Sequence, residues 1–285
     1  MRDNAVINRL TAAVPNPFLD IPQFQGGGLQ GKTVQVQQLL RPMPQFTGVS
    51  STLNDGFSWY HSLQLRVERR FARGFSIQGS YTWSKFMEAI DRLNDTDPTP
   101  HHVVAQQDRP QRVVINGIYE LPFGRGKRWL NVGGWLNAVV GGWQAQGIYQ
   151  GQSGPPLGFG NILFYGDIHN IVLPRAERRV ERWFNTEAGF ERDTRLQLAQ
   201  NIRTFPLRLT GLRGDGYNNW DLSLFKSWRI RERCTAQIRA EAQDALNHAM
   251  FAAPNTVPTN SAFGQVNASA APEQRRVNIA LRLSW

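Results

Sequence analysis

The sequence has 285 residues, of which 41% are hydrophobic, and a formal net charge of +10. No stretch approaches the roughly 18 uninterrupted apolar residues of a membrane-spanning helix, so a helical membrane protein is excluded. The mean hydropathy of -0.42 does not exclude a transmembrane β-barrel, because barrel strands alternate lipid-facing and lumen-facing side chains whose hydropathies cancel.

The charge and the cysteine content say little about a partner. The basic residues are dispersed and accompany no RNA- or DNA-binding signature, so we expect no nucleic-acid partner. The one cysteine, Cys234, cannot form an internal disulfide, which is compatible with an oxidising or a reducing compartment. Residues 1 to 6 lack the apolar core and the cleavage site of a signal peptide, which is an anomaly for an exported protein.

The first 58 residues show no sustained alternation of apolar and polar side chains. We expect residues 1 to 58 to be a loop-rich N-terminal segment with at most one weak strand, near residues 33 to 40. Residues 59 to 285 alternate repeatedly, and we expect them to form a second segment built of β-strands.

That segment opens with a predicted hairpin. From Phe75 to Ser84 the odd positions are apolar, aromatic or glycine and the even positions are small and polar or Gln78. The preceding stretch, from Ser62 to Phe71, alternates in the same way. Only Ala72-Arg73-Gly74 separates the two, so the pattern predicts two strands joined by a tight turn.

Further alternating stretches follow, and they are long. They cover residues 111 to 122, 138 to 151, 217 to 229, 233 to 245 and 276 to 285. Soluble sandwich strands average about five or six residues, whereas membrane-crossing strands need about nine to eleven. The sequence therefore predicts an all-β fold, the C-terminal part of an antiparallel transmembrane β-barrel with about 7–8 strands in an open or partial sheet. Residues 59 to 285 are accordingly expected to form an outer-membrane β-barrel segment.

The connections between these strands alternate in length. Those at 72 to 74 and 230 to 232 are tight, while those at 86 to 110, 152 to 216 and 246 to 275 are long. Outer-membrane barrels have short periplasmic turns and long extracellular loops, and a periplasmic C-terminus would send every long connection outside. Trp and Tyr residues also gather near the predicted strand ends, as in the aromatic belts of membrane proteins.

The last strand resembles the C-terminal signature of outer-membrane proteins that the barrel-assembly machinery recognises. Its alternate residues are apolar and it stops on an aromatic, the residues being Val277, Ile279, Leu281, Leu283 and Trp285. The usual terminal residue of that signature is Phe, so Trp285 is a conservative departure.

Beyond about residue 30, the chain also resembles the C-terminal barrel of Oar-like TonB-dependent transporters, which carry an N-terminal carboxypeptidase-regulatory-like domain. The segments that carry the resemblance include Gln38-Leu39-Leu40-Arg41-Pro42, Ser80-Tyr81-Thr82-Trp83-Ser84-Lys85, Gly117-Ile118-Tyr119-Glu120-Leu121-Pro122-Phe123-Gly124, Gly141-Gly142-Trp143-Gln144, Arg182-Trp183-Phe184-Asn185 and Ala245-Leu246-Asn247-His248.

The resemblance implies energy-dependent uptake through a barrel of about 22 strands with a plug inside. This chain has too few strands and shows no signal peptide, regulatory-like domain, plug or TonB box. A truncated reading frame is one explanation, and closure into a small eight-stranded barrel is another. The implied partners are outer-membrane lipid, lipopolysaccharide and the barrel-assembly machinery, with TonB acting only through the missing plug and box. The implied location is the bacterial outer membrane.

Several polar clusters are candidates for functional sites. Asp95, Asp97, His101 and His102 follow no metal-ligand spacing, and the histidines supply no catalytic triad, so we expect no metal, no cofactor and no enzymatic activity. Arg213-Gly214-Asp215 precedes a strand and is interpreted as a turn. A short basic helix of Arg175, Arg178, Arg179 and Arg182 would either contact lipopolysaccharide phosphates or lie solvated in the loop.

Three functions remain open. The first is a piece of a transporter that contributes lumen wall and extracellular loops to the uptake of an unknown substrate. The second is a structural or adhesive outer-membrane barrel. The third is a soluble β-rich carbohydrate-binding protein.

Overall fold

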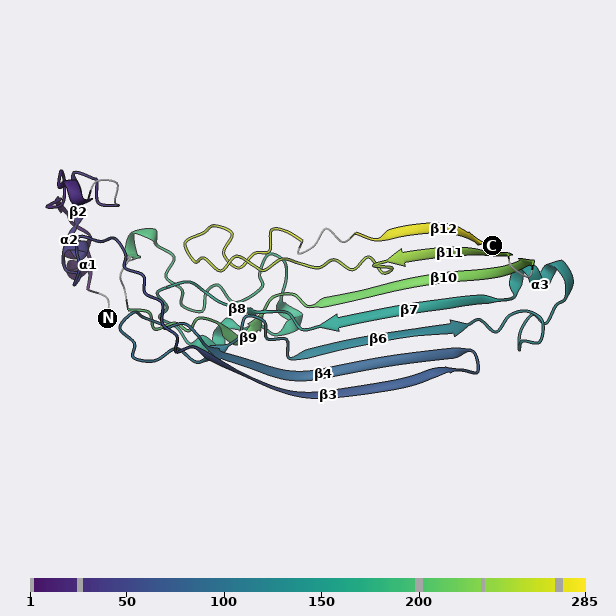
Figure 1. Ribbon diagram of the computed structural model, residues 1–285. Coiled ribbons are helices and arrows are strands. Elements are labelled where there is room, and N and C mark those ends of the chain that lie inside the picture. Colours follow the sequence, from purple (N-terminus) through teal and green to yellow (C-terminus); the bar gives the residue numbers. More distant parts are fainter. Residues whose placement is uncertain (1–2, 25–27, 198–201, 232–233, 270–273) are drawn as a thin grey trace.

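The computed structural model describes residues 3–24, 28–197, 202–231, 234–269 and 274–285. Its main feature is one large open antiparallel sheet with the strand order β12-β11-β10-β7-β6-β4-β3, to which the short β5 adds by pairing with β4 (Figure 1). The strands are β3 (Phe57–Ala72), β4 (Phe75–Ala89), β5 (Val103–Val104), β6 (Gln111–Glu120), β7 (Trp143–Gln152), β10 (Tyr217–Arg231), β11 (Cys234–Gln243) and β12 (Arg276–Ser284). The all-β prediction of an open antiparallel sheet is confirmed.

The hairpin of β3 and β4 shows how the sequence sets the register. Arg73 and Gly74 both have positive φ, 55° and 86°, as the tightest hairpin turns require. The pairing places Leu63 opposite Trp83 and Arg66 opposite Ser80. Apolar side chains therefore meet apolar ones on one face of the sheet and polar meet polar on the other.

The two faces continue across the neighbouring strands. Ile77 lies opposite Gly117, which lies opposite Gly147, which lies opposite Leu222. This apolar face is exposed, including Leu63, Ile77 and Ile279, so these side chains do not enter a sealed core. The other face is mainly polar in β3 and β4, and its residue Glu88 forms an ion pair with Arg208 of the loops.

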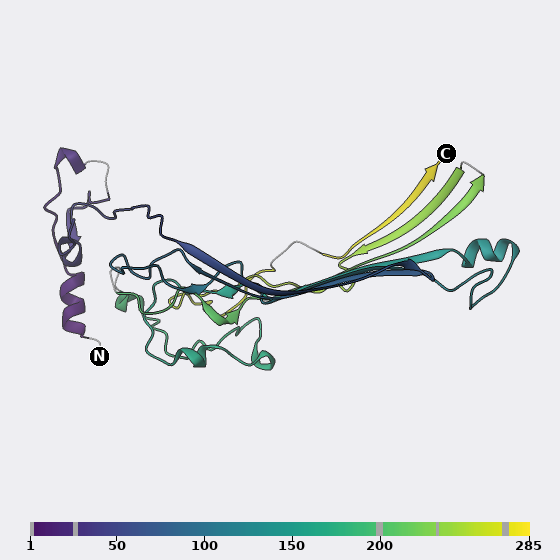
Figure 2. The same cartoon turned by 60° about the horizontal axis from the view of Figure 1, so that its bottom comes forward.

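The long connections form a small folded body at one end of the sheet, which we call the long-loop end (Figure 2). The body contains two short paired strands, β8 (Pro156–Leu157) and β9 (Leu209–Arg213), and the 3-10 helices η2 (Ile168–Ile171), η3 (Arg175–Glu177) and η4 (Thr194–Leu196). Its core holds buried aromatic and aliphatic side chains, among them Phe159, Ile171, Phe184, Phe190, Leu212 and Phe263. The sequence pattern predicts connections in this region but no core.

The opposite end carries the short turns and one helix. The helix α3 (Gly134–Val140) lies in the connection between β6 and β7. The strand predicted from residue 138 therefore starts later than expected, at Trp143. The apolar residues 138 to 140 have side chains that also suit a strand. However, Gly142 has a φ of 74°, which interrupts the extended backbone before β7.

The N-terminal segment has more regular structure than predicted. It contains α1 (Asn4–Thr11), β1 (Ala13–Pro15), η1 (Pro22–Phe24), β2 (Thr33–Gln35) and α2 (Val36–Leu39). At most one weak strand was expected, but β1 and β2 pair with each other. Strands of three residues are too short to show a period of two. Among the described residues, no helix is long and apolar enough to cross a membrane.

Candidate functional site

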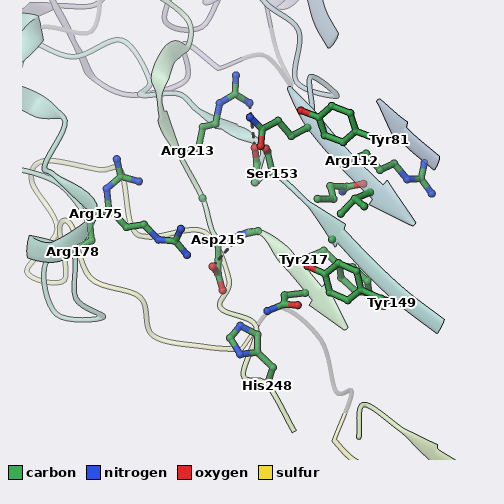
Figure 3. Close-up of a pocket in the computed structure, with 18 of the residues that line it drawn as sticks. Tyr81, Arg112, Tyr149, Ser153, Arg175, Arg178, Arg213, Asp215, Tyr217 and His248 are labelled. Carbon is green, nitrogen blue, oxygen red and sulfur yellow. Dashed lines mark hydrogen bonds between the residues drawn. The ribbon is translucent and has the colours of Figure 1, made fainter. Parts of the chain in front are cut away.

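A pocket of about 670 Å³ lies at the long-loop end, where β6, β7 and β10 meet the loop body (Figure 3). Its walls combine tyrosines with a group of basic side chains. The lining includes Tyr81, Arg112, Tyr149, Arg175, Arg178, Trp183, Arg213, Asp215, Tyr217 and His248. Residues of both sheet faces contribute because the strands end there.

The segment between β9 and β10 positions the centre of the pocket. Trp183 donates its indole N–H to the carbonyl of Arg213 at 2.7 Å, and the Asp215 carboxylate accepts from the amide of Phe251 at 3.0 Å. A Cβ on Gly154 would lie 2.0 Å from the carbonyl oxygen of Gly214. Only glycine fits this close approach of two backbone segments.

Two ion pairs attach the loop body to the sheet beside the pocket. Asp108 is 0% exposed, accepts from the amide of Phe86 at 2.7 Å and pairs with Arg213 at 2.6 Å. Arg208 pairs with Glu88 of β4 and also donates to the carbonyl of Val104 at 2.8 Å. The contacts of Arg208 and Arg213 join residues more than 100 positions apart in the sequence, so they fix the loops against the strands.

The pocket has an excess of positive charge. The charge of Arg213 is neutralised by its ion pair with Asp108. Asp215 adds one negative charge to the lining. Arg178 uses its Nε to donate to the carbonyl of Leu173 at 2.9 Å, and burial followed by the nearby Arg175 lowers the pKa of Arg178. It stays protonated at neutral pH. An anionic group would therefore be attracted to this space.

The predicted basic helix is only partly correct. Arg175 and Arg178 line the pocket, in a segment where the helix is reduced to the three residues of η3. Arg179 and Arg182 are absent from the lining; their backbones pair with each other through two 3.0 Å hydrogen bonds. The aromatic lining from β4, β7 and β10 was missed, because nothing in the sequence links these strand ends to residues 175 to 178.

The remaining candidate clusters are described by their contacts within the loops. Asp97 accepts from the amide of Asn94 at 2.8 Å, and no group of residues in the described ranges has a metal-binding arrangement. Burial, followed by Arg203 and His102, lowers the pKa of His101. Arg213 of the Arg-Gly-Asp tripeptide is turned toward Asp108, which supports its interpretation as a structural element.

The C-terminal signature residues lie together on one edge strand. Val277, Ile279, Leu281 and Leu283 alternate along β12 opposite Ala242, Ala240, Ile238 and Ala236 of β11. All four are exposed, as is Trp285. They form one margin of the apolar sheet face.

The sequence matches a known family, described as an outer membrane beta barrel domain, over residues 3–278. The chain belongs to this outer-membrane β-barrel family. No curated protein and no solved structure matches it significantly. The family match supports the outer membrane as the location and a barrel rather than a soluble carbohydrate-binding protein as the architecture.

For an outer-membrane barrel, the exposed apolar face has a direct explanation. Lipid-facing side chains of such barrels form an apolar band flanked by aromatic residues. Here the paired glycines Gly117 and Gly147 leave a shallow apolar groove of about 530 Å³ on this face. Tyr149 and Trp220 pack beside it with their ring centroids 4.6 Å apart.

Proposed function

We propose that this chain forms lumen wall and extracellular loops of a TonB-dependent outer-membrane transporter, and that the long-loop pocket takes part in the uptake of an anionic substrate. One observation carries the proposal: basic side chains and strand-end tyrosines line the same pocket. The basic side chains are Arg112, Arg175 and Arg178. The Oar-like sequence segments support the assignment to transport. We propose no enzymatic role.

Coupling to TonB would run through a plug and TonB box supplied outside this sequence. The role of this chain is then to bind substrate at the mouth and to line its path. Long loops lie on the extracellular side in barrels of this class, which supports a role for the pocket in meeting substrate from outside the cell. The second candidate function is a structural or adhesive barrel, which is favoured by the folded loop body with its own buried core at the long-loop end.

Growth on defined nutrients separates the two functions. A strain that lacks the gene should fail on a particular anionic source, chosen from iron chelates, phosphorylated sugars and uronic-acid oligosaccharides, and complementation should restore growth only while TonB is present. Arg178→Glu should lose this rescue by reversing a charge in the pocket, whereas Arg179→Glu, outside the lining, should keep it. A strain with detergent sensitivity on every source and no source-specific defect would support the structural barrel instead.

We also propose that β12 engages the barrel-assembly machinery through its apolar side chains. Trp285→Ala should then reduce the fraction of chain inserted in the outer membrane and increase its periplasmic degradation, because the terminal aromatic of the signature is lost. Ser284→Ala changes the other face of the strand and is the matched control. Pulse-chase fractionation measures both, and equal insertion of the two variants would contradict the proposal.

A further inference from the structure

The helix α3 is attached to the lipid-facing side of the sheet by three side chains. Lys226, Trp228 and Trp143 belong to the same face as Leu222 and Leu224. The indole of Trp228 donates to the carbonyl of Ala138 at 2.7 Å, and the indole of Trp143 donates to the carbonyl of Val139 at 2.9 Å. Both acceptors lie in the last turn of α3, whose carbonyls have no partners within the helix.

Lys226 is the centre of this attachment. It is only 2% exposed, and its ammonium donates to the carbonyls of Val139, at 2.9 Å, and of Gly141. The rings of Trp143 and Trp228 lie 5.5 and 5.2 Å from the ammonium. A lysine on a lipid-facing strand is costly unless its charge is satisfied. Here the end of α3 satisfies it, so lysine and helix stabilise each other.

The outer side of α3 is apolar and exposed. Trp135 is 75% exposed and Val139 is 58% exposed, and their spacing of four residues places them on one side of the helix. Leu136, beside them, is exposed as well, as are Trp129 and Leu130 earlier in the same connection. Trp129 packs on Phe123 with the ring centroids 5.8 Å apart, but within the described residues a large part of each of these side chains stays uncovered. A second apolar medium is needed to cover that surface.

The same connection carries the charges that a phospholipid surface attracts. Arg125 and Arg128 are exposed, and Lys127 pairs with Glu120 at the end of β6 at 3.0 Å. Basic groups next to a bilayer bind the phosphates of its headgroups. An apolar helix side with basic neighbours, continuous with a lipid-facing sheet, is the arrangement of a helix lying in the membrane interface.

We propose that α3 is an interfacial anchor, which lies in the headgroup region of the phospholipid leaflet at the short-turn end with Trp135, Leu136 and Val139 inserted toward the acyl chains. The proposal rests on membership of the outer-membrane barrel family and is independent of transport. Lys226 sets the depth of the helix in the membrane, because it joins the helix to the short-turn end of the lipid-facing strand β10.

Spin labels on the full chain test the position of α3. With Cys234→Ser as background, labels at Trp135→Cys and Val139→Cys are compared in outer membranes with Ile77→Cys on the lipid-facing strand surface and with Gly160→Cys in the loop body. Gly160 is exposed, and a Cβ at this position would meet no atom within 4 Å, so this label at the long-loop end is the water reference. The membranes used are those in which Ile77→Cys collides more with oxygen than with a water-soluble nickel chelate.

The α3 labels should then show the oxygen preference of Ile77→Cys, the reverse of the ratio at Gly160→Cys. A nickel preference at both α3 sites would overturn the proposal, and so would protection from both reagents, which would indicate a protein partner. Lys226→Met should increase the mobility of the label at Val139→Cys and remove its oxygen preference. Trp228→Phe, which removes a single donor and keeps a ring, should produce the same change to a smaller degree; no change in either variant would refute the role of the attachment.

Discussion

Asp108→Ala is expected to release the loop body from the sheet and to lower the free energy of unfolding by about 3–5 kcal/mol, the usual cost of breaking a buried ion pair from one side. The substitution leaves the amide of Phe86 without its acceptor and the guanidinium of Arg213 without its carboxylate. The carboxylate that both donors lose is at a position that is 0% exposed.

Limited proteolysis of intact membranes measures this effect, since released loops are cut faster. Asp108→Asn should be milder, because its amide oxygen can still accept from Phe86. Asp193→Ala is the matched control. Asp193 pairs with Arg195, whose side chain is 86% exposed, and exposed pairs contribute little. Equal cleavage of the Asp108→Ala and Asp193→Ala variants would show that the ion pair does not hold the loops.

Ile77→Arg is expected to reduce the amount of folded chain in the membrane more than tenfold. Ile77 lies in the apolar groove between the aromatic ends of the strands, and an arginine on the lipid face near mid-bilayer costs about 2–4 kcal/mol. Gln78→Arg is the control, because Gln78 faces the polar side opposite Glu68 and Asn116. A urea titration of the inserted fraction compares the two. Similar losses for both variants would contradict the assignment of faces.

The strands were predictable because the polarity of each residue indicates which face of the sheet its side chain occupies. In β4 a single alternation extends from Phe75 to Trp83, so the pattern locates the strand and assigns the side of Ile77 and Gln78 at once. The start of β7 was misplaced, since Val139 and Val140 suit a strand as well as a helix. Only the contacts of the Val139 carbonyl with Lys226 and Trp143 decide between the two.

The loop body and the pocket were less predictable for a related reason. Phe159, Phe184 and Phe263 pack together from separate irregular segments, so no periodicity connects them. The basic residues Arg175 and Arg178 could be recognised as a cluster, but their tyrosine neighbours depend on where β7 and β10 end. Tertiary contacts create such sites, and a single sequence does not show which of its distant residues come into contact.

The strand count of the open sheet has a consequence for the complete barrel. Along the path from β3 to β12 each strand is antiparallel to the next, and the path contains seven strands, so its two edge strands point in the same direction. If the sheet closed on itself, Phe57–Ala72 and Arg276–Ser284 would form a parallel pair, with 16 residues facing nine. A fully antiparallel barrel that contains this sheet therefore needs an odd number of further strands, and these must satisfy the unpaired backbone groups of both edges.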